Sequence, residues 1–171
     1  MLVVFTGLPG TGKSAIAEAI ARELGAPVFS VDPLEATLLR LGITREQRSD
    51  VAAYALAHTL ADGQLARGQS AVIDAVNGVP AVREQWEALA RRWDAPLVWI
   101  KTICSDEAAH RARVEGRNRG IEGFVHEPTW DDVEQVRATW YEPFAGEALV
   151  LDAVDPLDEN ISRALDRVGA R

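Results

Sequence analysis

The feature that most constrains this chain is a glycine-rich octapeptide placed between an apolar run and a helix-forming run. Residues 2–5 read Leu-Val-Val-Phe, residues 7–14 read Gly-Leu-Pro-Gly-Thr-Gly-Lys-Ser, and residues 15–21 are rich in alanine and isoleucine. Glycines let the backbone turn its N–H groups inward around an anion, and the positive end of the following helix faces the same point. A strand, a GxxxxGKS loop and a helix in this order predict a phosphate-binding loop for a nucleoside triphosphate.

Two side chains of the octapeptide have predicted roles of their own. Lys13 is expected to reach the β- and γ-phosphates, and the hydroxyl of Ser14 is expected to ligate Mg²⁺. The alternative is a glycine-rich turn that contains a lysine by chance, but such a turn does not require every fixed position and both flanks to match. The residues that we expect to bind ATP are the octapeptide and two arginines of a later segment, namely Gly7, Leu8, Pro9, Gly10, Thr11, Gly12, Lys13, Ser14, Arg113 and Arg117.

Strand-like and helix-like segments alternate along the remaining chain. Strands are predicted at residues 2–6, 27–31, 70–74, 97–103 and 148–152. Helices are predicted from residue 13 to about 24, at 33–41, 45–66 and 80–93, after an N-cap at Ser105, near 130–141 and at about 156–168. Alternation with right-handed crossovers predicts one α/β domain over residues 1–171. Its GxxxxGKS loop makes the chain similar to P-loop NTPases, and this resemblance implies a three-layer sandwich with a five-stranded parallel sheet in the order 2-3-1-4-5 and helices on both faces.

Two aspartates follow predicted strands at the edge where ligands of such sheets bind. Asp32 is expected at the N-cap of the next helix and also as the base that accepts a proton from an acceptor hydroxyl. Asp74 is expected to hold Mg²⁺ through water or to orient the acceptor. The alternatives are a capping role alone for Asp32 and a solvated strand end for Asp74. Asn77 and Arg83 are further candidates for contacts with the acceptor.

A basic segment stands out in an otherwise acidic chain. Residues 110–120 contain four arginines and one glutamate, and they run into a glycine-containing stretch, about 116–128, that we expect to be a mobile lid. Arg113 and Arg117 share one face if the helix continues that far. A lid arginine that reached the transferring phosphoryl group would neutralise its charge. The alternative is a solvated helix end, where cations are favoured by the helix dipole.

The overall charge bears on the partner. The chain has 18 Lys and Arg against 26 Asp and Glu, a formal net charge of −8, and its only lysines are Lys13 and Lys101. Such a surface repels phosphate backbones, which makes a nucleic-acid partner unlikely. The single cysteine, Cys104, is expected to be a buried strand residue in a reducing compartment. With no secretory signal and no membrane-length apolar run in sight, the expected location is the cytoplasm, away from membranes.

With these residues placed, the chain resembles small P-loop kinases of the nucleoside-monophosphate-kinase-like group. Bacterial AAA-domain kinases and the 5′-hydroxyl polynucleotide kinase domain are the nearest likenesses. The resemblance rests on the octapeptide, Ser-Val-Asp at 30–32, Ala-Val-Ile-Asp-Ala at 71–75, the lid sequence at 113–120 and Trp-Tyr-Glu-Pro-Phe at 140–144. It implies that Lys13 and Ser14 bind the nucleotide and Mg²⁺, that Asp32 is the base, and that Arg117 is the lid arginine.

The resemblance leaves the acceptor open, and three hypotheses remain. The first is a kinase that moves the γ-phosphoryl group of ATP to a small-molecule hydroxyl, the second is a 5′-hydroxyl polynucleotide kinase, and the third is a regulatory ATPase without an acceptor. Glu35 stands where a binder of an acceptor phosphate would need a cation, and Arg40 is more than a turn away. We therefore predict the first, with an uncharged or cationic acceptor.

Overall fold

The computed structural model describes residues 1–117, 120–122 and 127–169. Its centre is a sheet of five parallel strands in the order β2-β3-β1-β4-β5, which confirms the predicted fold class and strand order. The five strands are β1 (Leu2–Thr6), β2 (Val28–Ser30), β3 (Ala71–Asp74), β4 (Leu97–Ile103) and β5 (Leu149–Asp152).

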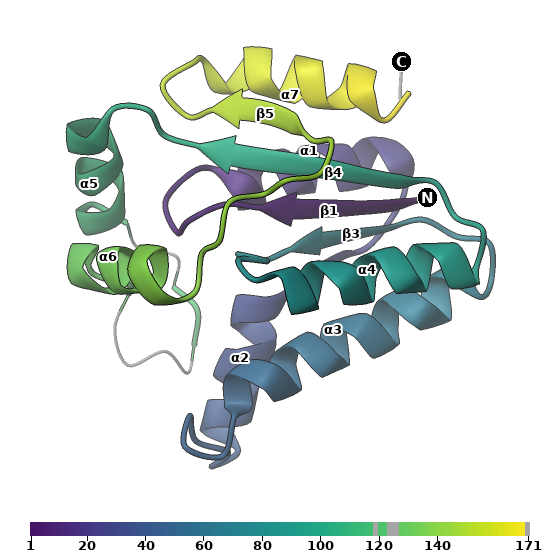
Figure 1. Cartoon of the computed structure of the whole chain (residues 1–171), viewed down its shortest axis with the longest axis horizontal. Coiled ribbons are helices and arrows are strands. Elements are labelled where there is room, and N and C mark those ends of the chain that lie inside the picture. Colours follow the sequence, from purple (N-terminus) through teal and green to yellow (C-terminus); the bar gives the residue numbers. More distant parts are fainter. Residues whose placement is uncertain (118–119, 123–126, 170–171) are drawn as a thin grey trace.

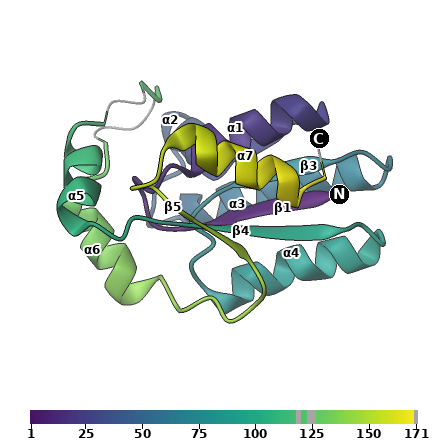
Figure 2. The same ribbon diagram turned by 90° about the horizontal axis from the view of Figure 1, so that it is seen from above.

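Helices follow the strands and cover both faces of the sheet (Figures 1 and 2). They are α1 (Lys13–Leu24), α2 (Val31–Arg40), α3 (Ser49–Leu65), α4 (Pro80–Arg92), α5 (Glu107–Glu115), α6 (Trp130–Thr139) and α7 (Leu157–Arg167). Helices α5 and α6 lie beyond the carboxyl ends of the strands, at the left in Figure 1. The loop between β1 and α1 reaches the same end, so this end of the sheet carries the candidate site.

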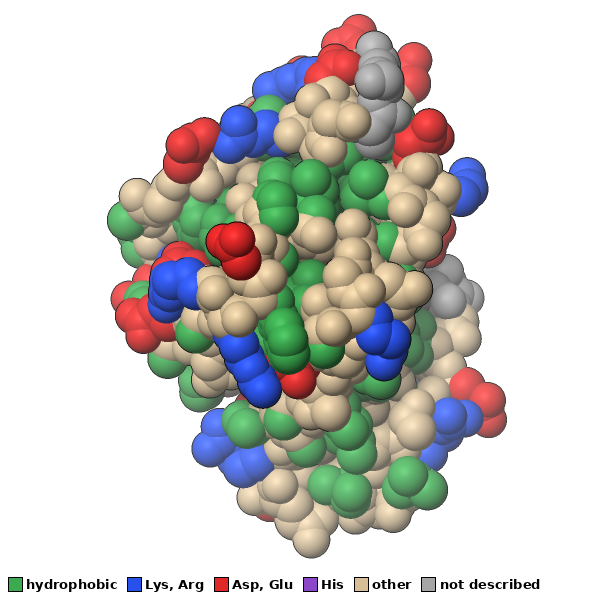
Figure 3. All heavy atoms as spheres, turned by 90° about the vertical axis from the view of Figure 1, so that its right-hand side faces the viewer, with side chains coloured by type: hydrophobic (Ala, Val, Ile, Leu, Met, Phe, Trp, Pro, Cys, Tyr) green, Lys and Arg blue, Asp and Glu red, His purple; other side chains and the backbone are tan. Residues whose placement is uncertain are grey.

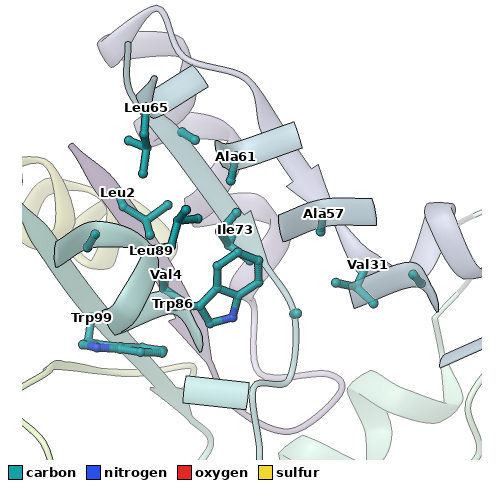
Figure 4. Packing of buried hydrophobic residues seen from close by; sticks show 14 residues of the cluster. Leu2, Val4, Val31, Ala57, Ala61, Leu65, Ile73, Trp86, Leu89 and Trp99 are labelled. Carbon is teal, nitrogen blue, oxygen red and sulfur yellow. The ribbon is translucent and has the colours of Figure 1, made fainter. Parts of the chain in front are cut away.

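Alternating side chains of the central strand divide the core into two layers. Leu2 and Val4 pack with α3 and α4, whereas Val3 and Phe5 pack with α1 and α7. In the first layer Trp86 of α4 is almost fully buried and lies among aliphatic side chains of β1, β3 and α4 (Figure 4). Strands buried on both faces need apolar residues throughout, which is why the five residues of β1 are all buried.

Three helix starts differ from the sequence-based prediction. Helix α2 begins at Val31 with Ser30 at its N-cap, so Asp32 lies inside the first turn. Helix α5 is capped by Asp106, whose carboxylate accepts a hydrogen bond from the Ala109 amide, and not by Ser105. Helix α3 begins at Ser49, because residues 44–48 form turns. Adjacent polar residues compete for the N-cap, and the pattern of residue types alone does not separate them.

The buried stripe of α3 consists mostly of alanines. Ala53, Ala57, Ala61 and Leu65 pack on the sheet, whereas Val51 is exposed. Alanines occur on several faces of this helix, so the spacing of apolar residues does not show which face is buried. The small side chains on the buried face let the helix lie close to the strands. Cys104 follows β4 instead of lying within it and is only partly buried.

The end of the molecule that lies away from the β1–α1 loop shows acidic and basic side chains scattered around apolar ones (Figure 3). Within the part of the chain that the structure describes, no helix is both long and apolar enough to cross a bilayer.

Candidate active site

Residues 7–14, which we call the phosphate loop, wrap around the ammonium group of Lys13. Its Nζ donates hydrogen bonds of 2.9 Å to the carbonyl oxygens of both Gly7 and Leu8. The side chain is buried, and Ser14 follows it in the first turn of α1. The loop thus holds its lysine at the amino end of α1, where the helix dipole favours an anion.

Two loop glycines could not be replaced without a change in the loop. Gly10 has φ +84°, and a Cβ there would lie 2.6 Å from Cγ2 of Val114 in α5. Gly7 has φ +153°, and its Cβ would lie 2.4 Å from the carbonyl oxygen of Thr102 in β4. Both positions combine a positive φ with close packing, so the glycines of the motif meet steric demands from outside the loop as well as within it.

Side chains far away in sequence fix the shape of the phosphate loop, and sequence analysis did not find them. His110 of α5 is almost fully buried, and its Nε2 lies 2.7 Å from the carbonyl oxygen of Pro9. Since a carbonyl only accepts, this nitrogen carries a proton. Thr102 shares a hydrogen bond of 2.7 Å with Thr11. The buried His110 and Thr102 were not distinguishable from core residues, because neither belongs to a local motif.

The carboxyl ends of β2 and β3 bring two predicted residues to the same edge. Ser30 pairs with Asp74 in register, and its hydroxyl donates a 2.6 Å hydrogen bond to Asp74 Oδ2. Asp74 is buried, and Asp32 lies two residues beyond Ser30. Ser30 is therefore a further polar residue of the site that the sequence-based assignment left out.

Tyr54 of α3 is a phenol whose hydroxyl contacts the backbone just after β3. Its hydroxyl accepts a 3.2 Å hydrogen bond from the Asn77 amide. Burial raises the pKa of Tyr54, and the nearby negative charges of Asp32, Asp74 and Glu35 raise it further. The phenol of Tyr54 therefore stays uncharged at neutral pH.

Asn77 and Arg83 hold the backbone together in this structure. Asn77 has φ +45°, its Nδ2 donates to the Phe5 carbonyl oxygen at 2.6 Å, and its Oδ1 accepts from the Trp86 indole at 2.9 Å. The buried guanidinium of Arg83 donates four hydrogen bonds to the carbonyl oxygens of residues 77, 78, 142 and 143. The hydrogen bonds of these two side chains hold parts of the protein together. Contact of either side chain with an acceptor stays a prediction.

Glu35 is placed differently from our expectation. It is buried where α2 meets α3, and its Oε1 accepts hydrogen bonds from Arg45 at 3.1 Å and from Ser49 at 3.2 Å. Glu35 thus links α2 to α3, and its charge is balanced by Arg45. Because its role is accounted for within the protein, Glu35 no longer supports the argument for an acceptor without phosphate. Arg40, more than a turn further along α2, pairs with Glu122 at 3.0 Å.

The two lid arginines do not share a helix face, because α5 ends at Glu115. Arg113 donates a 2.6 Å hydrogen bond to the Ala153 carbonyl oxygen and lines a hollow together with Thr11 and Gly12. Arg117 lines a separate hollow of about 350 Å³ between α5 and α6. The rest of the predicted lid is described only in part, since residues 118–119 and 123–126 lie outside the described residues.

Comparison with known proteins agrees with this geometry. A family model described as an AAA domain matches residues 2–139. A UPF0200 protein of Aeropyrum pernix is 32% identical over 163 residues, which are 88% of this chain and 80% of that protein. The adenylate kinase of Mycobacterium marinum is 27% identical over 190 residues, covering 99% of each chain.

Solved structures share the fold. The Mycobacterium tuberculosis APS kinase CysC, determined in complex with AMPPNP and APS, aligns with a TM-score of 0.71 at 19% sequence identity, covering 98% of this chain and 96% of that one. The matched family model covers the phosphate loop, both carboxyl-edge aspartates and helices α1 to α6. The chain therefore belongs to this AAA-domain family of P-loop kinases, as its resemblance to small P-loop kinases predicted.

Proposed function

We propose that this chain transfers the γ-phosphoryl group of ATP to a hydroxyl group of a small molecule. We also propose that residues 1–171 form the single domain that carries out this reaction. The observation that carries the proposal is the convergence of a complete phosphate loop with Asp32 and Asp74 at one edge of the sheet. The loop would bind the phosphates through its N–H groups and Lys13. Kinase relatives and a nucleotide-bound structural neighbour support the nucleotide half of this proposal.

The proposed step is an in-line displacement. The acceptor hydroxyl gives its proton to the carboxylate of Asp32 while its oxygen forms a bond to the γ-phosphorus. The bond between the γ-phosphorus and the β–γ bridging oxygen breaks, and ADP leaves with that electron pair. Lys13 would neutralise charge on the phosphoryl oxygens, and Arg117 would do so from the α5 side.

The oxygen donors at this edge suit Mg²⁺, which prefers carboxylate, hydroxyl, water and phosphate oxygens. Asp74 uses Oδ2 to accept from Ser30, and Ser14 lies in the first turn of α1. Asp74 and Ser14 would hold the ion, and Asp74 would do so through a water molecule. When bound with ATP, Mg²⁺ would neutralise the β- and γ-phosphates. Asp74 would in addition orient the acceptor.

Three arginines, at the end of α2, in the loop after it and in α4, are already engaged by the protein. Arg40 pairs with Glu122, Arg45 pairs with Glu35, and Arg83 donates to four backbone carbonyls. An acceptor that carries a phosphate, as in adenylate kinase, needs cations to balance its charge. This arrangement favours an uncharged or cationic hydroxyl compound over a phosphorylated one and over a nucleic-acid end.

The test is ADP formation with and without defined acceptors. We expect turnover to rise with a neutral or amine-bearing hydroxyl compound and to stay basal with AMP and with 5′-hydroxyl oligonucleotides at physiological salt. Efficient labelling of oligonucleotide ends would contradict the small-molecule assignment and support a polynucleotide kinase. Stimulation by AMP alone would contradict the hydroxyl acceptor.

A further inference from the structure

A narrow hollow lies behind the phosphate loop, between α1 and the start of α7. It encloses about 60 Å³, and its lining includes Thr11, Gly12, Ile16, Arg113, Leu157 and Asn160. Its wall therefore includes two residues of the phosphate loop and one of the lid arginines. A nucleotide whose phosphates lie in the loop would have this hollow within reach of its base.

Asn160 of α7 is 2% exposed, and its Oδ1 is the one buried side-chain polar atom without a hydrogen-bond partner among the residues that the structure describes. Its Nδ2 donates a 2.6 Å hydrogen bond to the carbonyl oxygen of Asp152. Because a carbonyl oxygen accepts and never donates, this contact fixes the orientation of the amide. The atom left over is the acceptor, and a buried acceptor without a donor is costly to keep.

We propose that Asn160 Oδ1 accepts a hydrogen bond from the 6-amino group of adenine and so selects ATP over 6-oxopurine nucleotides. This inference rests on the proposed function, since it requires a nucleotide in the phosphate loop. An exocyclic amino group offers the donor that Oδ1 lacks. The 6-oxo group of guanine or hypoxanthine would instead bring a second acceptor to the same place.

The hollow must widen to admit a base, and Arg113 is the side chain that can provide the room. Its Nη2 bond to the Ala153 carbonyl oxygen joins two walls of the hollow. A guanidinium released from this bond can lie over the face of a purine ring, where the electron-rich face attracts it. Ile16 and Leu157 supply apolar contacts for the same ring.

The experiment compares the binding of two Mg²⁺-nucleotides by calorimetry, without any acceptor. One is ATP, and the other is purine riboside 5′-triphosphate, which differs only in lacking the 6-amino group. We expect the wild type to bind ATP about tenfold more tightly, the size of one hydrogen bond to a buried acceptor, and to bind inosine triphosphate more weakly than either. In Asn160→Leu, which keeps the branched shape, the preference for ATP over purine riboside triphosphate should fall to about onefold.

Glu159→Gln, an exposed neighbour on the same helix, is the matched control and should keep the wild-type ratio. Equal binding of the two nucleotides by the wild type would overturn the inference while leaving the proposed function intact. A preference that persists in Asn160→Leu would also overturn it, because another acceptor such as Asp155 would then be responsible. If Asn160→Leu does not fold, Asn160→Ala is judged by the same two ratios. Failure of the wild type to bind any nucleotide would overturn both proposals.

Discussion

The phosphate loop and the wall beside it, which consists of α2, the start of α3, residues 75–83 and residues 142–143, are built in opposite ways. The loop is eight contiguous residues, and its lysine bonds to carbonyls of that same segment. The wall is assembled from segments far apart in the chain, and Arg83 ties residues 77 and 78 to residues 142 and 143. The difference suggests that substitutions in the loop will chiefly affect chemistry, whereas substitutions in the wall will chiefly affect folding.

Asp32 lies in the wall, but the proposed mechanism uses it as the base. Its substitution should therefore affect chemistry more than folding. Asp32→Asn keeps the shape of the side chain and removes the base, so we expect phosphoryl transfer to slow by about 10²–10⁴-fold with binding of an ATP analogue unchanged. Rapid-quench kinetics and calorimetry measure the two effects, with the exposed Asp158→Asn as control. Loss of ATP-analogue binding in a folded variant would place Asp32 in the nucleotide site instead.

Lys13→Ala tests the loop. Removal of one preorganised group that stabilises charge typically costs about 10²–10³-fold in rate, and we expect that loss in kcat without a comparable loss in unfolding free energy. The chain offers one matched control, Lys101→Ala, because it has only two lysines. Activity of Lys13→Ala within twofold of the wild type would contradict the role of Lys13.

Arg83→Met tests the opposite expectation for the wall. Four carbonyl oxygens lose their donor and the contact of the guanidinium with the Phe144 ring is lost. We expect the unfolding free energy in urea to fall by about 3 kcal/mol, against little change for Arg91→Met, an exposed residue of the same helix. A wild-type unfolding curve with a raised KM for the acceptor would instead support the contact predicted from the sequence.

Tyr54→Phe should have the smallest effect at neutral pH, about 1 kcal/mol, because the Asn77 amide loses its acceptor. The effect on alkaline stability has a definite sign. Burial raises the pKa of folded Tyr54 above its ordinary value of 10.0, so above pH 10 the unfolded chain releases a proton that the folded chain retains. Stability therefore falls as the pH rises, by up to about 1.4 kcal/mol per pH unit.

Urea unfolding between pH 8 and 11 measures this slope, and it should be shallower in Tyr54→Phe than in the wild type. Parallel curves for the two proteins would show that Tyr54 ionises in the folded state as it does in the unfolded state.

The same contrast explains what could be predicted from the sequence. The phosphate loop and the strands follow from local patterns, the strand order follows from the resemblance to P-loop NTPases, and the structure confirms the fold. The sequence predicted that Arg83 contacts an acceptor. An arginine shortly after a strand gives the same sequence pattern whether it binds a ligand or backbone carbonyl oxygens. Two of the four carbonyl partners of Arg83 lie about 60 residues away, and no local pattern reports them.

The helix caps and the lid show a second limit. Arg113 and Arg117 were expected on one face because spacing assumes a continuous helix, and α5 ends between them. His110 and Asn160 gave no sequence signal, since a single polar residue in a helix is ordinary until its burial and partners are known. In both cases the missing information is tertiary contact, which decides whether a polar group faces water, backbone or ligand.

The central claim is that the γ-phosphoryl group is transferred to an organic hydroxyl. The most direct measurement follows radiolabel from γ-labelled ATP during a single turnover with Mg²⁺ and a set of neutral and amine-bearing hydroxyl compounds. The account predicts that the label moves to one of these compounds as ADP forms, and that Lys13→Ala reduces this transfer. If all the label appeared as inorganic phosphate with every acceptor, the chain would hydrolyse ATP without transferring its phosphoryl group to a hydroxyl, and the claim would be wrong.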